Sequence, residues 1–293
     1  MNIGMTLPIM ESHLDRATLK HWCDIIDNGP WASLALGERI AFVNPEFLTT
    51  LAAAAAWTNR VELVATISVA ALHAPIVLAK QFATIDMLSN GRLTVGVGTG
   101  GREEDYRAAN TDWKRHTLAA LQEQVEAMQA VWRGDIPEGL PRAIDPRPVR
   151  GDIPVLAGAL GPKAIARAAQ YSQGLCGFSF GASTDDIQAT FQSADAAWAT
   201  AGRNDKPRKM SSFWFAVGEP EKAREQVNAH LRHYLTWLPK EIVEAMLPTS
   251  GFAGTLEQLK ERMAELRAIG TDDIVLVPTS RDAAQLKTLE ALF

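Results

Sequence analysis

Short runs of Val, Ile and Leu alternate with longer amphipathic stretches along the whole chain. Runs of this length bounded by Gly, Pro and polar residues are typical of buried strands, and the longer stretches are typical of helices. Strands that alternate with helices predict a parallel sheet covered by helices, an α/β fold. The predicted strands are Asn2–Leu7, Ala32–Gly37, Val61–Ile67, Arg92–Val97, Pro154–Gly158, Gly174–Phe178, Met210–Val217 and Asp273–Val277.

Two helices have clear boundary signals in the sequence. A helix over Pro75–Ser89 begins with a proline that suits the first turn, and Asn90 and Gly91 provide a stop signal at its end. Thr255 and Gln258 have the spacing of a capping box, which predicts a second helix that continues to about Ile269.

Alternating strands and helices build either an open doubly wound sheet or a closed barrel. Eight strands without a linker at the midpoint favour a TIM-like (β/α)8 barrel that spans residues 1–293 as a single domain. Two segments, 135–152 and 235–254, do not fit the repeat. They are either insertions over the catalytic face or ordinary surface connections.

Charge and cysteine content narrow the classes of partner. The chain has 29 basic and 34 acidic residues without a long basic run, which argues against nucleic acid as the main partner. Cys23 and Cys176 are far apart, so we expect no disulfide and a reducing cytoplasm. The first residues lack the pattern of a signal peptide, and Leu51–Trp57 is too short to span a membrane, so we expect a cytoplasmic protein without a membrane segment.

In a barrel of this type, functional side chains follow the carboxyl ends of the strands. Glu38 and Arg39 follow the second strand, where they are either a structural ion pair or part of the active site. His73 follows the third strand and either packs against the next helix or takes part in catalysis. Glu103 follows the fourth strand, and it either compensates a helix dipole or acts as a catalytic acid.

Glycines at two further strand ends predict a ligand site. The segment Gly96–Gly101 matches GxGxxG, but the acidic residue of a dinucleotide site is missing from its expected place, so we interpret the glycines as room for a flat ligand. Ala157–Lys163 forms a small-residue turn that leads into a helix, which is a candidate phosphate cradle. Cys176 and Gly177 on the next strand are expected beside it among the cofactor contacts, with Cys176 as a small buried side chain rather than a nucleophile.

Other chemistries lack their sequence signals. No metal-binding spacing, nucleophile elbow or P-loop occurs, and His230 and His233 are interpreted as a surface pair without a third ligand. We therefore expect no metal site. A chain with few nucleophiles and many glycine turns indicates that a bound organic cofactor supplies the chemistry.

The strand-end segments together resemble the luciferase-like family of flavin- and deazaflavin-dependent oxidoreductases. The most specific segment is Pro75–Tyr106, supported by Ala32–Glu38, Pro154–Ala164 and Gly270–Pro278. The resemblance implies a TIM-like barrel that binds FMN or the deazaflavin coenzyme F-420 at its mouth. It also implies a non-proline cis peptide at Ala65-Thr66 or Thr66-Ile67. The residues implied to hold the ring, the ribityl chain or the phosphate are Ala65, Thr66, Gly98, Thr99, Gly100, Gly101, Ala157, Gly158, Gly161 and Pro162.

One departure from the family pattern concerns the proton donor. Many deazaflavin members have an acidic residue followed by His at the end of the second strand, where this chain has Glu38 and Arg39. The remaining candidates for a catalytic proton donor are Glu38, His73, Glu103 and His13.

The resemblance implies hydride transfer between the cofactor and a small organic substrate. The compact length favours the deazaflavin over FMN. One alternative is an FMN-dependent monooxygenase that activates oxygen, and another is a flavin-binding barrel without turnover. Dimerisation is expected by analogy with the family.

Overall fold

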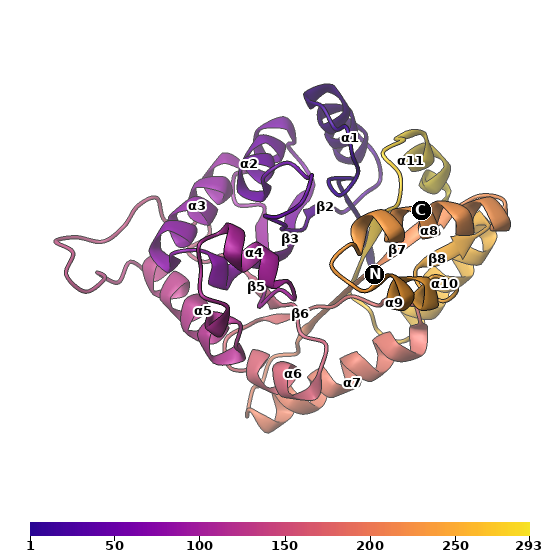
Figure 1. Ribbon diagram of the computed structural model, residues 1–293. Helices are drawn as coiled ribbons and strands as arrows, with labels where there is room; N and C mark the ends of the chain where they lie inside the picture. The colour runs from indigo at the N-terminus through magenta and orange to yellow at the C-terminus, as the bar shows by residue number, and fades with distance from the viewer.

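Eight parallel strands close into a barrel with helices arranged around it (Figure 1). The computed structural model describes residues 1–293. The hydrogen-bonded order is β6-β5-β4-β3-β2-β1-β9-β7, and pairing of β6 with β7 closes the ring, which confirms the predicted (β/α)8 architecture. The barrel strands are β1 (Asn2–Thr6), β2 (Ser33–Leu36), β3 (Glu62–Val69), β4 (Leu93–Gly98), β5 (Val155–Ala157), β6 (Gly174–Cys176), β7 (Arg208–Val217) and β9 (Asp273–Pro278).

The helices cover the outer face of the strands and bury a continuous apolar layer against them. None of them combines the length and the apolar character needed to cross a bilayer. The α-helices are α1 (Arg16–Asn28), α2 (Phe47–Trp57), α3 (Pro75–Leu88), α4 (Glu103–Ala108), α5 (Leu118–Arg133), α6 (Pro162–Ala168), α7 (Thr184–Thr200), α8 (Pro220–Tyr234), α9 (Lys240–Met246), α10 (Leu256–Ala268) and α11 (Ala284–Leu289), with 3-10 turns at Ala70–Leu72, Trp113–Arg115 and Glu290–Leu292.

Both helices with clear sequence signals form where they were predicted. Pro75 occupies the first turn of α3, and after that helix Asn90 and Gly91 have positive φ values of 57° and 79°, which redirect the chain into β4. In α10 the side chains of Thr255 and Gln258 each accept a hydrogen bond from the other residue's backbone N–H, so the capping box is present.

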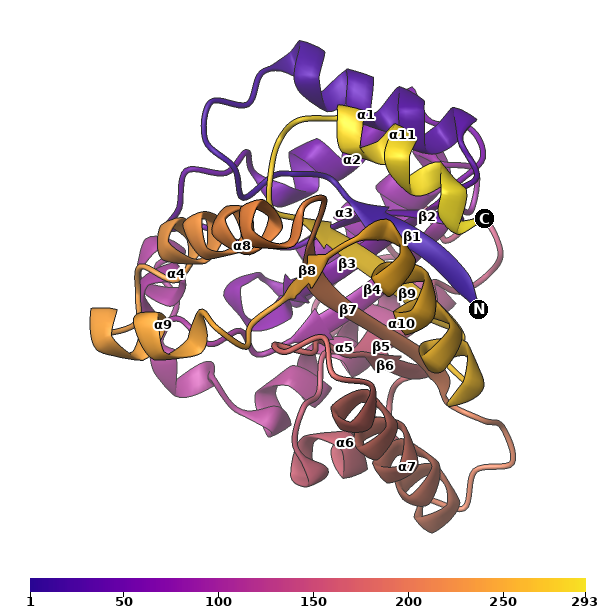
Figure 2. The same cartoon turned by 90° about the vertical axis from the view of Figure 1, so that its right-hand side faces the viewer.

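The two segments outside the repeat have different structures. Residues 134–154, between α5 and β5, contain no helix or strand and extend away from the barrel as a long loop (Figure 1). The segment 235–254 contains α9 and the strand β8 (Phe252–Gly254), which pairs only with the end of β7. In Figure 2, α9 lies on the same side of the barrel as α4, the side to which the carboxyl ends of the strands point. This second segment therefore covers part of the catalytic face.

The barrel interior is filled in layers below that face. At the amino ends of the strands, the Arg208 guanidinium donates two hydrogen bonds of 2.8 Å to Glu62 and one of 2.7 Å to Asp273. Asn2 and Thr94 add hydrogen bonds to the same two carboxylates. Above this ionic layer lies an apolar cluster formed by Ala35, Val64, Leu156, Cys176, Met210 and Val275. The two layers fill the barrel below its carboxyl end, where a cavity lies.

Candidate active site

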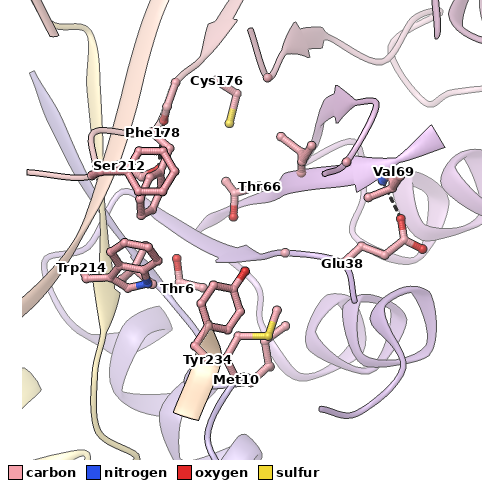
Figure 3. A pocket seen from close by; sticks show the side chains of 18 of the residues that line it. Thr6, Met10, Glu38, Thr66, Val69, Cys176, Phe178, Ser212, Trp214 and Tyr234 are labelled. Atoms are coloured by element: carbon pink, nitrogen blue, oxygen red, sulfur yellow. Dashed lines mark hydrogen bonds between the residues drawn. The ribbon is translucent and has the colours of Figure 1, made fainter. Parts of the chain in front are cut away.

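A cavity of about 290 Å³ lies at the carboxyl ends of the strands (Figure 3). Its lining comes from the ends of the barrel strands, from the last residue of α8 and from the segment that follows it. Most of the lining is apolar or glycine. The side chains that shape it include Thr6, Met10, Thr66, Ile67, Val69, Phe178, Phe180, Trp214, Tyr234 and Trp237.

The structure brings part of the predicted site to this cavity. Six of the residues predicted from the sequence line it: Glu38, Thr66, Gly100, Gly158, Cys176 and Gly177. The remaining predicted residues lie behind or beside the wall without lining it: Ala65, His73, Gly98, Thr99, Gly101, Glu103, Ala157, Gly161 and Pro162. The strand ends therefore converge as expected, and contact with a ligand stays a prediction for each residue.

The end of β3 forms an irregular wall of the cavity. The Thr66-Ile67 peptide bond is cis, at one of the two positions implied by the family resemblance, and the register with β4 shifts between Ala65 and Ser68. Two glycines make room for this turn. A Cβ at Gly158 would lie 2.9 Å from Ile67 Cγ2, and a Cβ at Gly98 would overlap the same side chain. The packing of Ile67 therefore requires glycine at both positions, which explains these glycines independently of the predicted ligand contact.

Glu38 is the acidic side chain of the cavity wall, and it is fully hydrogen-bonded. Its Oε2 accepts hydrogen bonds from Ser68 Oγ at 3.0 Å and from the Val69 N–H at 2.7 Å (Figure 3). Its Oε1 lies 2.6 Å from Nε2 of His73. The carboxylate is fully buried, whereas the His73 side chain keeps 19% of its surface exposed. The structure therefore joins two of the predicted catalytic residues into one pair.

The environment of His73 favours its protonated form. Burial alone lowers the pKa of the imidazole, but the hydrogen bond and the charge of Glu38 outweigh it, so the pKa is raised above its usual value. The His73 backbone carbonyl also accepts a hydrogen bond from Gln124, which fixes the turn before α3. The pair can hold a proton between Glu38 Oε1, in the cavity wall, and His73 Nε2 beside it.

Arg39 does not pair with its neighbour Glu38, so the interpretation of these two residues as a structural ion pair is wrong. Its buried guanidinium lies 2.6 Å from Glu104 Oε1 and 3.4 Å from Asp105 Oδ2, both on α4. Burial is the main cause that lowers the pKa of this guanidinium. The carboxylate Oδ1 of Asp105 also accepts hydrogen bonds from the backbone N–H groups of residues 40 and 41. Arg39 therefore fastens the loop after β2 to α4.

The two other candidate proton donors lie away from the cavity. The Glu103 side chain is 56% exposed on the first turn of α4 and lies 4.0 Å from Arg107 on the same helix. His13 is exposed, and its backbone carbonyl accepts a hydrogen bond from Arg281. For Glu103 this placement agrees with the alternative of dipole compensation at a helix start.

The glycine-rich loop after β4 is held by two side chains from outside the barrel. The Tyr106 hydroxyl donates a hydrogen bond of 2.7 Å to the carbonyl of Thr99, and Nε2 of His116 lies 2.8 Å from the carbonyl of Gly100. The His116 ring stacks on Trp113 with 4.1 Å between centroids, which fixes its orientation. Tyr106, His116 and Trp113 therefore hold the loop in place beside the cavity.

The turn after β5 leads into α6 with its amide groups free. Gly161 is the N-cap residue of α6 and Pro162 occupies the first turn, and no side chain caps the helix. Uncapped N–H groups at a helix start can bind an anion. Gly158 in the same turn reaches the cavity wall. The arrangement has the backbone groups that the predicted phosphate cradle requires.

Cys176 connects the cavity to the barrel interior. It lines the cavity and also belongs to the apolar cluster below it. Burial raises the pKa of its thiol to about 12, so the side chain stays protonated at neutral pH. This environment agrees with the interpretation of Cys176 as a small apolar side chain. No three His, Cys, Asp or Glu side chains anywhere in the chain are arranged to hold a metal ion.

Several residues of the site were missed at the level of sequence. Phe178 and Trp214 meet edge to face with 4.5 Å between centroids, and Tyr234 adds a third ring to the same wall. His230, interpreted as part of a surface pair, is buried, and its Nδ1 lies 2.6 Å from Glu11 Oε1. That interpretation of His230 is wrong. The one available sequence signal was the concentration of aromatic residues after β6 and in β7.

Two observations test whether this cavity fits a flat cofactor. The backbone at Gly37, Gly100, Gly158 and Gly177 forms part of the wall, and a Cβ at each would meet neighbouring protein atoms at 2.8–3.4 Å, so the backbone itself is the surface that a ring would contact. The buried hydroxyl of Thr6, at the end of β1, has no hydrogen-bond partner within the protein. A flat ring with polar edges fits both an open backbone surface and an unpaired hydroxyl.

Comparisons with known proteins agree with this geometry. The model of the luciferase-like monooxygenase family matches residues 27–273. An uncharacterized protein of Mycobacterium tuberculosis is 35% identical over 171 residues, which cover 54% of this chain and 58% of that protein. An F-420-dependent glucose-6-phosphate dehydrogenase of Amycolatopsis mediterranei is 30% identical over 128 residues, 40% of this chain and 38% of that enzyme. An FMNH2-dependent dimethylsulfone monooxygenase of Pseudomonas fluorescens is 23% identical over 68% of this chain and 63% of that enzyme.

The matched segments thus cover less than two thirds of each of these relatives. Solved structures match the fold over the full chain. A monooxygenase from Streptomyces bottropensis has a TM-score of 0.81 at 20% identity, covering 100% of this chain and 97% of that one. An F-420-dependent secondary alcohol dehydrogenase has a TM-score of 0.82 at 16% identity, covering 100% and 98%. With a family model that spans most of the barrel, this chain belongs to the luciferase-like monooxygenase family, which has both F-420-dependent and FMN-dependent members.

Proposed function

We propose that this chain is an oxidoreductase that transfers a hydride between bound coenzyme F-420 and a small organic substrate. The observation that carries the proposal is the pair formed by Glu38, in the wall of a largely apolar cavity, and His73, beside that wall. The cavity has no activated nucleophile, because burial keeps the Cys176 thiol protonated. When bound, the cofactor supplies the two-electron chemistry that these side chains lack.

The roles of the chain's own residues follow from their positions. The open backbone at Gly100, Gly158 and Gly177 would carry the flat ring, and the uncapped start of α6 would bind the phosphate. The pair of Glu38 Oε1 and His73 Nε2 would hold the proton that a carbonyl substrate takes up when it is reduced. The aromatic walls keep water away from the reacting atoms.

Similarity to F-420-dependent enzymes supports the deazaflavin. An F-420-dependent glucose-6-phosphate dehydrogenase of Nocardia farcinica is 36% identical over 95 residues, which cover 31% of this chain. The second candidate function is an FMN-dependent monooxygenase. It is favoured by the longer alignment with the dimethylsulfone enzyme, which covers 68% of this chain.

Titration of the protein with F-420 and with FMN, followed by cofactor fluorescence, tests the proposal. We expect F-420 to bind, whereas binding of FMN alone would favour the monooxygenase. Binding of neither would defeat both. If F-420 binds without any turnover on a panel of carbonyl and alcohol substrates, the barrel is a carrier of the cofactor rather than an enzyme.

A pair of glycine variants tests the phosphate cradle. Gly161 and Gly218 both have open space around the position of a Cβ, and neither has a positive φ. Gly161→Asp is expected to weaken cofactor binding by about 10-fold, because the new carboxylate repels a phosphate at the start of α6. Gly218→Asp adds the same charge elsewhere and is expected to leave the affinity unchanged. Equal affinities for both variants would contradict the assignment.

A further inference from the structure

The cavity is lined by two charged side chains, Glu38 and Arg102, and only Glu38 has a direct ion-pair partner. Glu38 accepts hydrogen bonds from Ser68 and Val69 and pairs with His73, whose pKa is raised. Arg102 has no carboxylate within 4.0 Å, although its neighbour Arg39 has two. Arg102 is therefore the charged side chain of the cavity wall that has no direct ion-pair partner, with the carboxylates of Glu104 and Asp105 paired to the nearby Arg39.

The Arg102 guanidinium is held in place but not satisfied. Its Cζ lies 3.8 Å from the centroid of the Trp237 ring, and its Nη2 donates a hydrogen bond of 2.7 Å to the hydroxyl of Tyr234. Its Nε is buried and has no hydrogen-bond partner. A buried N–H group without a partner is costly, and an arginine held by stacking loses little entropy when it binds an anion.

The side chains around Arg102 define the rest of the ligand. Tyr234, Trp237 and Trp214 belong to one aromatic cluster that lines the cavity on the same side. Figure 3 shows Tyr234 and Trp214 on one side of the cavity, across from Glu38. Aromatic walls of this kind favour a flat apolar body, and a guanidinium fork matches a planar carboxylate with two hydrogen bonds.

We propose that the substrate is a flat, apolar carboxylate, and that Arg102 binds its carboxylate group and so determines specificity. This assignment rests on the proposed function, because it places the substrate in the same cavity as the cofactor. Arg102 comes from the loop between β4 and α4, whereas Tyr234 and Trp237 come from the end of α8 and the segment after it. The specificity pocket thus forms only when these two parts of the chain pack together.

Calorimetric titration with 2-naphthoate and its neutral analogue 2-naphthamide tests the assignment. The wild-type protein is expected to bind naphthoate about 10-fold to 100-fold more tightly, as a charge-assisted hydrogen-bond pair predicts. Arg102→Met is expected to abolish this preference and to keep the affinity for naphthamide, which also reports that the variant is folded. Arg107→Met is the matched control, because the Arg107 side chain is 74% exposed on α4.

Two outcomes would overturn the assignment directly. One is a wild-type protein that binds both probes equally. The other is a preference for naphthoate that survives in Arg102→Met.

Cofactor titrations of the same proteins separate this proposal from the proposed function. If neither F-420 nor FMN binds to the wild-type protein, the proposed function fails, and the comparison of the two probes still decides the role of Arg102. If Arg102→Met loses affinity for the cofactor, or if saturating cofactor displaces naphthoate, Arg102 belongs to the cofactor site and the substrate assignment is wrong. Retained naphthoate binding in the presence of the cofactor supports it.

Discussion

Replacing Glu38 by Gln removes one charge from the cavity wall and keeps the shape of the side chain. The carboxylate accepts hydrogen bonds from Ser68 and Val69 and pairs with His73 at 2.6 Å. A hydrogen bond to a charged group contributes about 1.5–3 kcal/mol, and a neutral one contributes about 1 kcal/mol. Three weakened interactions are partly offset because the variant no longer buries a charge. We therefore expect a loss of about 2 kcal/mol in the free energy of unfolding for Glu38→Gln.

The change must also appear in the titration of His73. Glu38 is what raises the pKa of this imidazole against the effect of burial, so in Glu38→Gln the pKa is expected to fall below that of the wild-type protein. A raised pKa in the folded state stabilises the protein fully below the unfolded value of about 6.5, and this contribution is lost as the pH rises through the folded value. The difference in the free energy of unfolding between wild type and variant should therefore be largest at about pH 6 and smaller at about pH 9.

Two measurements check these expectations. NMR titration of the imidazole protons, with His73→Asn to assign the signal, gives the pKa in each protein. Urea unfolding of Glu38→Gln, His73→Asn and the double variant gives the coupling energy between the two residues. Glu103→Gln is the matched control, since its side chain is more than half exposed. An unchanged His73 pKa in Glu38→Gln, or a coupling energy near zero at pH 6, would refute the reasoning.

Three further predictions concern the barrel itself. In urea unfolding, Gly96→Ala is expected to destabilise the protein by about 2 kcal/mol or more, because its Cβ would overlap the backbone carbonyl of Ala65. Gly101→Ala is the control, because its Cβ would meet no atom within 4 Å, and it should leave the free energy of unfolding unchanged. The Cys176 thiol, with its pKa raised to about 12, should not react with an aromatic disulfide reagent near neutral pH until denaturant is added; rapid labelling of the native protein would contradict its burial. Arg208→Lys should lower the free energy of unfolding by about 2 kcal/mol, because a lysine cannot reproduce the hydrogen bonds of the guanidinium to both Glu62 and Asp273. An unchanged urea midpoint would show that the ionic layer adds little stability.

Most of the barrel could be predicted from the sequence because its strands are apolar runs buried on both faces. In β2, for example, all four residues from Ser33 to Leu36 are buried. The strand β8 was not predicted, because Phe252–Gly254 is only three residues long and pairs with the very end of β7. Its pairing depends on the position of β7, which no local pattern encodes.

The candidate site was predictable as a place but not as a set of contacts. Glu38 and His73 were both named from their positions after strands, yet their hydrogen bond joins residues 35 positions apart. Glu38 and Arg39 are adjacent in sequence but take different partners, His73 and Glu104, which lie far from both along the chain. The contact of Arg102 with Tyr234 spans 132 positions and becomes visible only in the folded chain.

The filled interior of the barrel has a kinetic consequence. Below the cavity, the apolar cluster around Met210 and Val275 and then the ionic layer around Arg208 leave no passage to the other end of the barrel. Every molecule must enter and leave by the same mouth. Cofactor and substrate must therefore share one entrance, and a ligand held near the surface would slow the exchange of any ligand held deeper.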